Sequence, residues 1–151
     1  MGLGSGTVAV NRRDLQQLAE ERILDTKALL DAGRWSGAYY LAGYAAEYAL
    51  KSCILHHIEK TGMIFQDRKY LKDLGDSWTH QLDRLLDLAG LTAVLGPATG
   101  ANPVLHSYWS FVKDWNERSR YEPKTEVQAR ALYEALTQEP DRVLRWLRTY
   151  W

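Results

Sequence analysis

The chain has 151 residues, of which 46% are hydrophobic and 25% are charged, so it is long enough for one domain with a real core and too short for two full ones. Nineteen Lys and Arg residues balance nineteen Asp and Glu residues, which excludes a global field that would draw the molecule onto nucleic acid or an anionic membrane. Any basic site must therefore be local.

The first ten residues, the length of the apolar runs and the single cysteine bear on where the protein is expected in the cell. Residues 1–10 are Gly-rich and uncharged and lack the basic start and long apolar core of a signal peptide, and no run reaches the ~18 apolar residues of a spanning helix. We expect a flexible segment over residues 1–10, a single helical domain over residues 11–151, a cytoplasmic location and no membrane. Cys53 has no second cysteine to pair with, and its apolar surroundings predict a buried, inert thiol.

Two long helices are predicted first. Asn11 or Asp14 can cap a helix that extends to Gly33. Its apolar positions form one broad stripe: Leu15, Leu18, Ile23, Leu24, Ala28 and Leu29. The second helix is predicted over residues 34–60, and it should stop at Gly62, because glycine takes the left-handed conformation that ends helices.

The middle of the chain contains more helix-breaking residues. Residues 63–77 are predicted to be a connection with one short helical piece. Thr79 should cap a third helix that continues past Gly90 to Leu95, and composition predicts a loop over residues 96–103.

The last part is again helical. A fourth helix should begin near Pro103 and end near residues 121–123, with Tyr108, Phe111, Val112 and Trp115 on one face. Thr125 should cap a fifth helix, and Pro140 either breaks it or opens a last one. The positions of the fifth helix predicted to face inward are Val127, Ala131, Leu132, Ala135 and Leu136. No segment alternates as a strand, so the fold class is all-α, and the mostly short links favour an antiparallel, up-and-down bundle of four to five helices.

Glu47 is the single charge within sixteen small, apolar or aromatic residues, 35–50. A carboxylate is costly to bury unless another group pairs with it. Lys51, four residues further on, offers an ordinary intrahelical pair. The sharper hypothesis is that Glu47 accepts hydrogen bonds from Arg118 or Arg120 across the bundle.

A polar cluster near the end of the predicted fourth helix is the candidate binding site. Asp114, Arg118 and Tyr121 fall at i, i+4 and i+7, and Asn116 and Arg120 form a neighbouring i, i+4 pair. Guanidinium groups suit phosphate and the ring suits a base or ribose, so the cluster predicts nucleotide or RNA contact. Alternatively, the arginines only compensate the helix dipole.

The histidines and tyrosines have ordinary explanations. His80 follows a predicted cap, so packing or hydrogen bonding at a helix start is one interpretation and proton transfer is the other. His56 and His57 have no metal-ligand spacing, and we expect no metal and no cofactor. Three aromatic residues recur every four positions and indicate core or interface packing: Tyr40, Tyr44 and Tyr48.

Three segments resemble the HEPN domain family of prokaryotic toxin–antitoxin and nucleotidyltransferase-linked proteins. They are residues 38–51 (AYYLAGYAAEYALK), residues 79–82 (THQL) and residues 116–121 (NERSRY). The resemblance implies a four- or five-helix up-and-down bundle, usually dimeric. It also implies a ribonuclease, a nucleotide-binding module or a partner of a small nucleotidyltransferase.

The ribonuclease motif of the family is missing. Catalytic HEPN members carry Arg, four to six residues, then His, near the fourth helix. Here the last histidine, His106, precedes Arg118, and eleven residues separate Arg68 from His80. The predicted function is therefore a non-catalytic nucleotide- or RNA-binding module, acting as a homodimer with a nucleotidyltransferase partner in a toxin–antitoxin or defence setting.

In that prediction Arg118 and Arg120 hold phosphate, Tyr121 stacks or hydrogen bonds, and Glu47 positions an arginine. Two alternatives stay open. One is an atypical, metal-independent ribonuclease with Arg118 at the phosphate and Tyr121, His80 or Glu47 moving protons. The other is a purely structural dimerisation module that needs no ligand.

Overall fold

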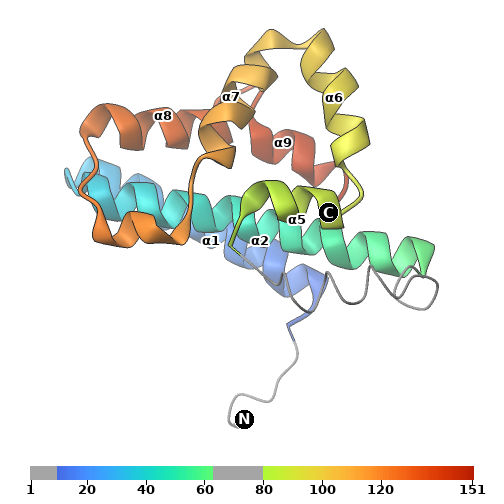
Figure 1. Ribbon diagram of the computed structural model, residues 1–151. Coiled ribbons are helices and arrows are strands. Elements are labelled where there is room, and N and C mark those ends of the chain that lie inside the picture. The colour runs from blue at the N-terminus through green and yellow to red at the C-terminus, as the bar shows by residue number, and fades with distance from the viewer. Residues whose placement is uncertain (1–9, 63–79) are drawn as a thin grey trace, which may run out of the picture.

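The computed structural model describes residues 10–62 and 80–151, and within those ranges the chain is all-α, as predicted. The helices, shown in Figure 1, are α1 (Arg12–Asp31), α2 (Trp35–Thr61), α5 (Leu82–Leu88), α6 (Thr92–Ala101), α7 (Pro103–Lys113), the 3₁₀ helix η1 (Glu117–Tyr121), α8 (Glu126–Thr137) and α9 (Val143–Arg148). The predictions for residues 1–9, for the connection over 63–77 and for Thr79 lie outside the described residues. No helix in the described part is long and apolar enough to cross a membrane.

Helices α1 and α2 form an antiparallel hairpin with the predicted ends. Asn11 caps α1, its side chain accepting from the backbone N–H of Asp14 while the Asp14 carboxylate accepts from the N–H of Asn11. Gly33 makes the turn with φ of 72°, and Gly62 ends α2 with φ of 64°.

Helix α2 is the centre of the molecule. It is covered by α1, α5, α8, α9 and η1, and most of its buried side chains are small. Trp115, 1% exposed, lies flat over Gly43, where a Cβ atom would come within 1.9 Å of the indole ring. Residue 43 must therefore be glycine for the Trp115 ring to pack this closely on α2.

The third predicted helix is confirmed over Leu82–Leu88, but its continuation past Gly90 and the loop predicted after it are wrong. Gly90, with φ of 72°, separates α5 from α6, and α6 covers most of the predicted loop. Gly96 and Gly100 do not have positive φ, and a Cβ atom at either would meet nothing within 4 Å. Glycine on an open helical face costs only some stability, so composition alone misplaced this loop.

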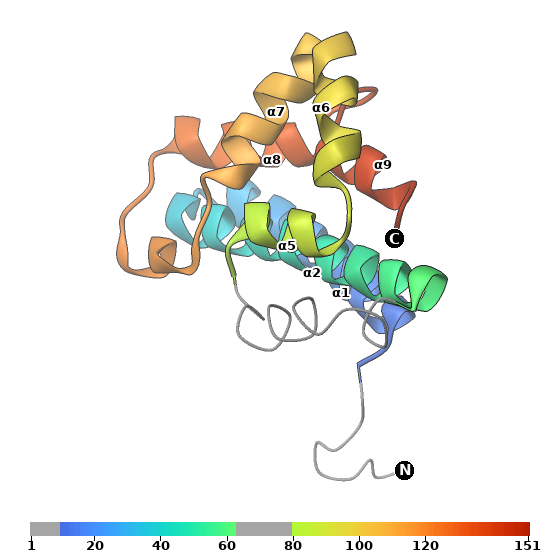
Figure 2. The same cartoon turned by 45° about the vertical axis from the view of Figure 1, so that its right-hand side comes forward.

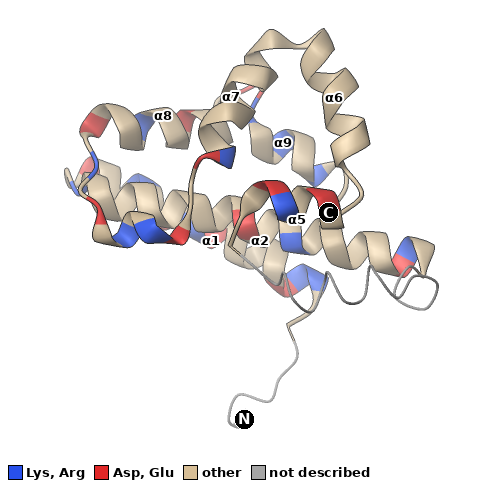
Figure 3. Cartoon of the chain, viewed as in Figure 1, with Lys and Arg blue, Asp and Glu red and all other residues tan. Residues whose placement is uncertain are grey.

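Helices α6 and α7 stand away from the α1–α2 layer as a second hairpin (Figure 2). From residue 92 to residue 112 the chain has no Lys, Arg, Asp or Glu. Figure 3 shows this hairpin free of charge until the end of α7, where Lys113 and Asp114 lead into η1.

Helix α7 is shorter than predicted. It begins at Pro103 as expected but ends at Lys113, and the Asn116 side chain then caps a separate 3₁₀ helix by accepting from the N–H of Arg118 at 2.9 Å. The i, i+4, i+7 face predicted for Asp114, Arg118 and Tyr121 does not exist, because these residues do not share one helix.

Some predicted inward positions are also wrong. Leu24, Phe111 and Val127 are exposed, and Ala28 is exposed as well, although helical spacing put them on apolar stripes. The residues buried on those helices include Leu30, Trp109 and Ala129. The apolar face of a helix is wider than the part that a neighbouring helix covers. Helical spacing alone therefore does not show which residues of that face are buried.

The end of α9 is tied back to the first two helices. The Trp151 carbonyl oxygen accepts from Arg12 Nε, Gln16 Nε2 and Ser52 Oγ, each at 2.8 Å. The chain therefore closes on the α1–α2 hairpin.

Candidate functional site

One face of α2 carries the buried polar groups. Glu47 is 1% exposed, and both of its carboxylate oxygens are paired. Lys51 Nζ lies 3.1 Å from Oε2, which is the intrahelical pair predicted, and His80 Nδ1 lies 2.6 Å from Oε1. The contact across the fold thus comes from His80, where an arginine was expected.

His80 joins two elements. Its Nδ1 faces Glu47 on α2, and its Nε2 lies 3.1 Å from Oε2 of Glu117 on η1. His80 was predicted to hydrogen bond at a helix start, and it does so just before α5, but Glu117 was not predicted as its second partner. The position of Glu117 in the same short segment as Arg118 was the only available signal.

A cavity of about 560 Å³ opens beside this histidine. It is lined by two stretches of chain: His80, Gln81 and Asp83 on one side, and Lys113, Asp114, Trp115, Asn116, Glu117 and Arg118 on the other. The lining mixes cations with carboxylates and amides, so it offers both donors and acceptors to a ligand. Four of the predicted site residues meet here: His80, Asp114, Asn116 and Arg118.

Arg120 and Tyr121 do not line this cavity. The Arg120 guanidinium lies 4.7 Å from the centroid of the Tyr121 ring. Hydrogen bonds to the hydroxyls of Tyr40 and then Tyr121 raise the pKa of Arg120, and the residue is exposed. The site predicted as one face is therefore divided into two parts, one on each side of η1.

The tyrosines of α2 connect the two parts. The Tyr40 hydroxyl donates to the Tyr44 hydroxyl at 3.2 Å, and the Tyr44 ring meets His80 edge-on with centroids 5.9 Å apart. Burial and the hydrogen bond from Tyr40 raise the pKa of Tyr44 well above its ordinary range. Trp115 packs against both tyrosine rings, at 5.1 Å from Tyr44 and 6.3 Å from Tyr40. The predicted role of these tyrosines as packing aromatics is thus consistent with their contacts, and they also border the site.

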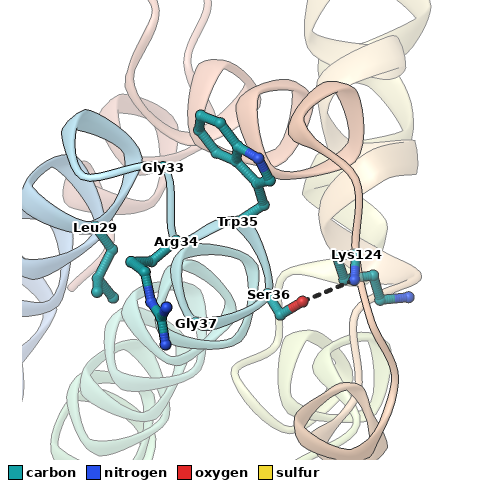
Figure 4. Close-up of a pocket in the computed structure, with 7 residues that line it drawn as sticks. All are labelled: Leu29, Gly33, Arg34, Trp35, Ser36, Gly37 and Lys124. Carbon is teal, nitrogen blue, oxygen red and sulfur yellow. Dashed lines mark hydrogen bonds between the residues drawn. The ribbon is translucent and has the colours of Figure 1, made fainter.

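A second cavity, of about 440 Å³, lies at the start of α2. Figure 4 shows its lining, with Trp35 and Arg34 pointing in opposite directions from the first turn and Ser36 accepting from the backbone N–H of Lys124 at 2.9 Å. The Lys124 ammonium is directed elsewhere, to Glu122 at 3.3 Å and to the Tyr39 ring. This lining contains no carboxylate or imidazole, so the His80 cavity is the better candidate for function.

The described residues support neither a metal site nor a reactive cysteine. Within residues 10–62 and 80–151, no group of three or more His, Cys, Asp or Glu side chains could hold a metal ion. Cys53 is buried, as predicted, and burial raises its pKa to about 12, which leaves the thiol protonated and inert at neutral pH.

Comparisons of the chain with protein-family models, curated proteins and solved structures found no significant match. The function must therefore be inferred from the residues and their geometry.

Proposed function

We propose that this chain is a HEPN-type helical module that binds a nucleotide or RNA, without catalysis, in the cavity between His80 and Arg118. One observation carries the proposal. The three segments that resemble HEPN domains, far apart in sequence, meet at His80, which contacts Glu47 of the first segment and Glu117 of the third. A shared site explains why the resemblance is concentrated in those segments.

The chemistry of the cavity suits a nucleotide. Arg118 and Lys113 can pair with phosphate, and Asp83 and Asp114 can accept from ribose hydroxyls or base amino groups. The volume of about 560 Å³ lies within the usual ~300–1,000 Å³ of small-molecule sites. Both the charge and the size therefore support a nucleoside phosphate as the bound unit.

The proposal extends to the arrangement of helices and to partners. The α1–α2 hairpin, with α8 packed on it and α7 packed on α8, is compatible with a four-helix up-and-down unit, to which α5, α6 and α9 would be additions. A homodimer, a nucleotidyltransferase partner and a prokaryotic toxin–antitoxin or defence setting follow from the resemblance alone, and a cytoplasmic location is part of the same proposal.

Equilibrium binding tests the proposal. Fluorescence anisotropy with labelled nucleotides and a labelled RNA pool should give saturable, salt-dependent binding by the unchanged chain and strongly weakened binding by Arg118→Ala. Arg13→Ala removes an exposed arginine of α1 and is the matched control, which should bind normally. Absence of binding, or equal binding by Arg118→Ala, would contradict the proposal and favour the structural dimerisation module.

One contact favours a second candidate, a metal-independent ribonuclease. The buried Glu47 carboxylate, 2.6 Å from His80, orients an imidazole that lines the same cavity as Arg118. A histidine oriented in this way could move protons while the arginine holds the phosphate. Tyr121, the other proton carrier considered, is outside the cavity.

Cleavage of a labelled RNA pool in the presence of a chelator distinguishes the two. Cutting that disappears in both His80→Ala and Arg118→Ala would establish the ribonuclease. Binding without cutting would leave the non-catalytic module.

A further inference from the structure

The two arginines of η1 lie on either side of a buried serine. Ser119 is 3% exposed, whereas Arg118 and Arg120 are both exposed. A 3₁₀ helix has three residues per turn, so the neighbours of an inward-facing residue point away on opposite sides. Accordingly Arg118 lines the His80 cavity, and Arg120 lies against Tyr40 and Tyr121.

Arg120 contacts phenol groups, whereas several other arginines of this chain contact carboxylates. Arg130, for example, lies 2.8 Å from Glu126. In the described part of the chain, Arg120 instead contacts two neutral phenols, those of Tyr40 and Tyr121. These phenols fix the guanidinium in place and leave its charge uncompensated, which is the condition for binding an anion.

Tyr121 adds a second binding surface. It is 76% exposed, the largest exposed aromatic residue in the described ranges, and one face of its ring is covered by the Arg120 guanidinium. An exposed ring beside a fixed cation is a platform on which a nucleobase can stack.

We infer that the ligand is a single-stranded oligonucleotide that crosses η1, with one phosphate at Arg118, a second phosphate at Arg120 and a base stacked on Tyr121. The inference rests on the proposed function, because Arg118 and its cavity provide the first contact. Two guanidinium groups on opposite sides of one helix cannot share a single phosphate, whereas successive phosphates of one strand can reach both. Stacking and phosphate contacts do not read bases, so binding should tolerate changes of sequence.

The test is an anisotropy titration of the full chain with a labelled mononucleotide, a dinucleotide and a single-stranded octanucleotide of RNA, over a series of salt concentrations. The octanucleotide should bind far more tightly than the mononucleotide. Arg120→Ala should weaken octanucleotide binding by a larger factor than mononucleotide binding and reduce the slope of log K against log salt for the octanucleotide by about 0.7. Arg120→Lys, which keeps the charge, should retain most of that slope.

Tyr121 gives an independent readout. Tyr121→Ala should weaken octanucleotide binding by roughly 5-fold or more, because one base loses its stacking partner, and Tyr121→Phe should retain binding. Circular dichroism verifies that each variant is folded.

Two results would overturn the inference and leave the proposed function intact. One is equal affinity for mononucleotide and octanucleotide, with dependence on Arg118 alone. The other is equally tight binding of duplex RNA, whose paired bases cannot stack on Tyr121. By contrast, failure of the unchanged chain to bind any of these ligands would contradict the proposed function itself.

Discussion

The Nδ1 atom of His80 lies 2.6 Å from the Oε1 atom of Glu47, and this contact joins the segment before α5 to the buried centre of α2. The other oxygen of Glu47 accepts from Lys51. A carboxylate that is 1% exposed is therefore paired on both sides, and the elements around it depend on its charge.

Glu47→Gln should destabilise the fold by about 3 kcal/mol, because it removes the buried negative charge that pairs with the Lys51 ammonium and contacts the His80 imidazole. Urea unfolding measures the change in the free energy of unfolding. The matched control is Glu126→Gln, the same substitution at the exposed ion pair with Arg130, which should cost ~0.5 kcal/mol or less. Equal costs at both positions would mean that the Glu47 cluster does not stabilise the fold.

Gly43→Ala should destabilise the fold by about 1–3 kcal/mol, because the added Cβ atom would lie within 1.9 Å of the Trp115 ring. Gly100→Ala is the control, since its Cβ atom meets nothing within 4 Å and its φ is not positive. This control should be neutral or stabilising by about 0.5–1 kcal/mol. Thermal unfolding measures both variants, and a Gly43→Ala protein as stable as the control would show that Trp115 does not pack there.

Acidification should weaken the fold through His57. Burial, followed by Lys60 and His56, lowers the pKa of His57 below its ordinary value near ~6.5. Between the lowered pKa of the folded protein and the ordinary value of ~6.5, His57 binds more protons in the unfolded chain than in the folded one. The contribution of His57 to the free energy of unfolding is therefore fully present above pH ~6.5 and declines as the pH falls towards the folded pKa. Urea midpoints at two pH values on either side of ~6.5 measure this loss.

His57→Gln isolates the contribution, because it removes the His57 imidazole and leaves the rest of the chain unchanged. The variant should lose less stability on acidification than the unchanged chain. An identical loss in the two proteins would remove His57 from the explanation.

Cys53 should resist alkylation in the folded protein. Burial raises the pKa of its thiol to about 12, and its Sγ atom lies 3.6 Å from the Leu147 carbonyl oxygen. A thiol reagent should react slowly at neutral pH and rapidly once urea unfolds the chain. Rapid reaction without denaturant would show that α9 opens readily over Cys53.

Local signals predicted the parts of the fold that local chemistry determines. Asn11 and Gly62 mark helix ends because capping and left-handed geometry involve only neighbouring residues. The same reasoning failed at Gly96, which lies on an open helical face, and at Asn116, whose side chain begins a new helix within an apparently continuous one. These outcomes depend on what covers each residue.

The candidate site was predicted in its residue types more than in its geometry. Arg118 and His80 were both named and line one cavity, and the pair of Glu47 with Lys51 was predicted. The partner of Glu47 across the fold is His80 and not the expected arginine, and Glu117 was missed. A contact between residues 33 positions apart depends on how α2 and the segment before α5 pack. Spacing along one helix carries no information about it.

The buried positions of α2 include five alanines, which lose no side-chain conformational entropy when the chain folds. They are Ala38, Ala42, Ala45, Ala46 and Ala49. Tyr44 and Glu47 therefore project from a helix whose position is fixed by close backbone packing, with few rotatable groups beneath it. The proposed binding face is in this sense organised before a ligand arrives, so little ordering entropy should be lost if one binds.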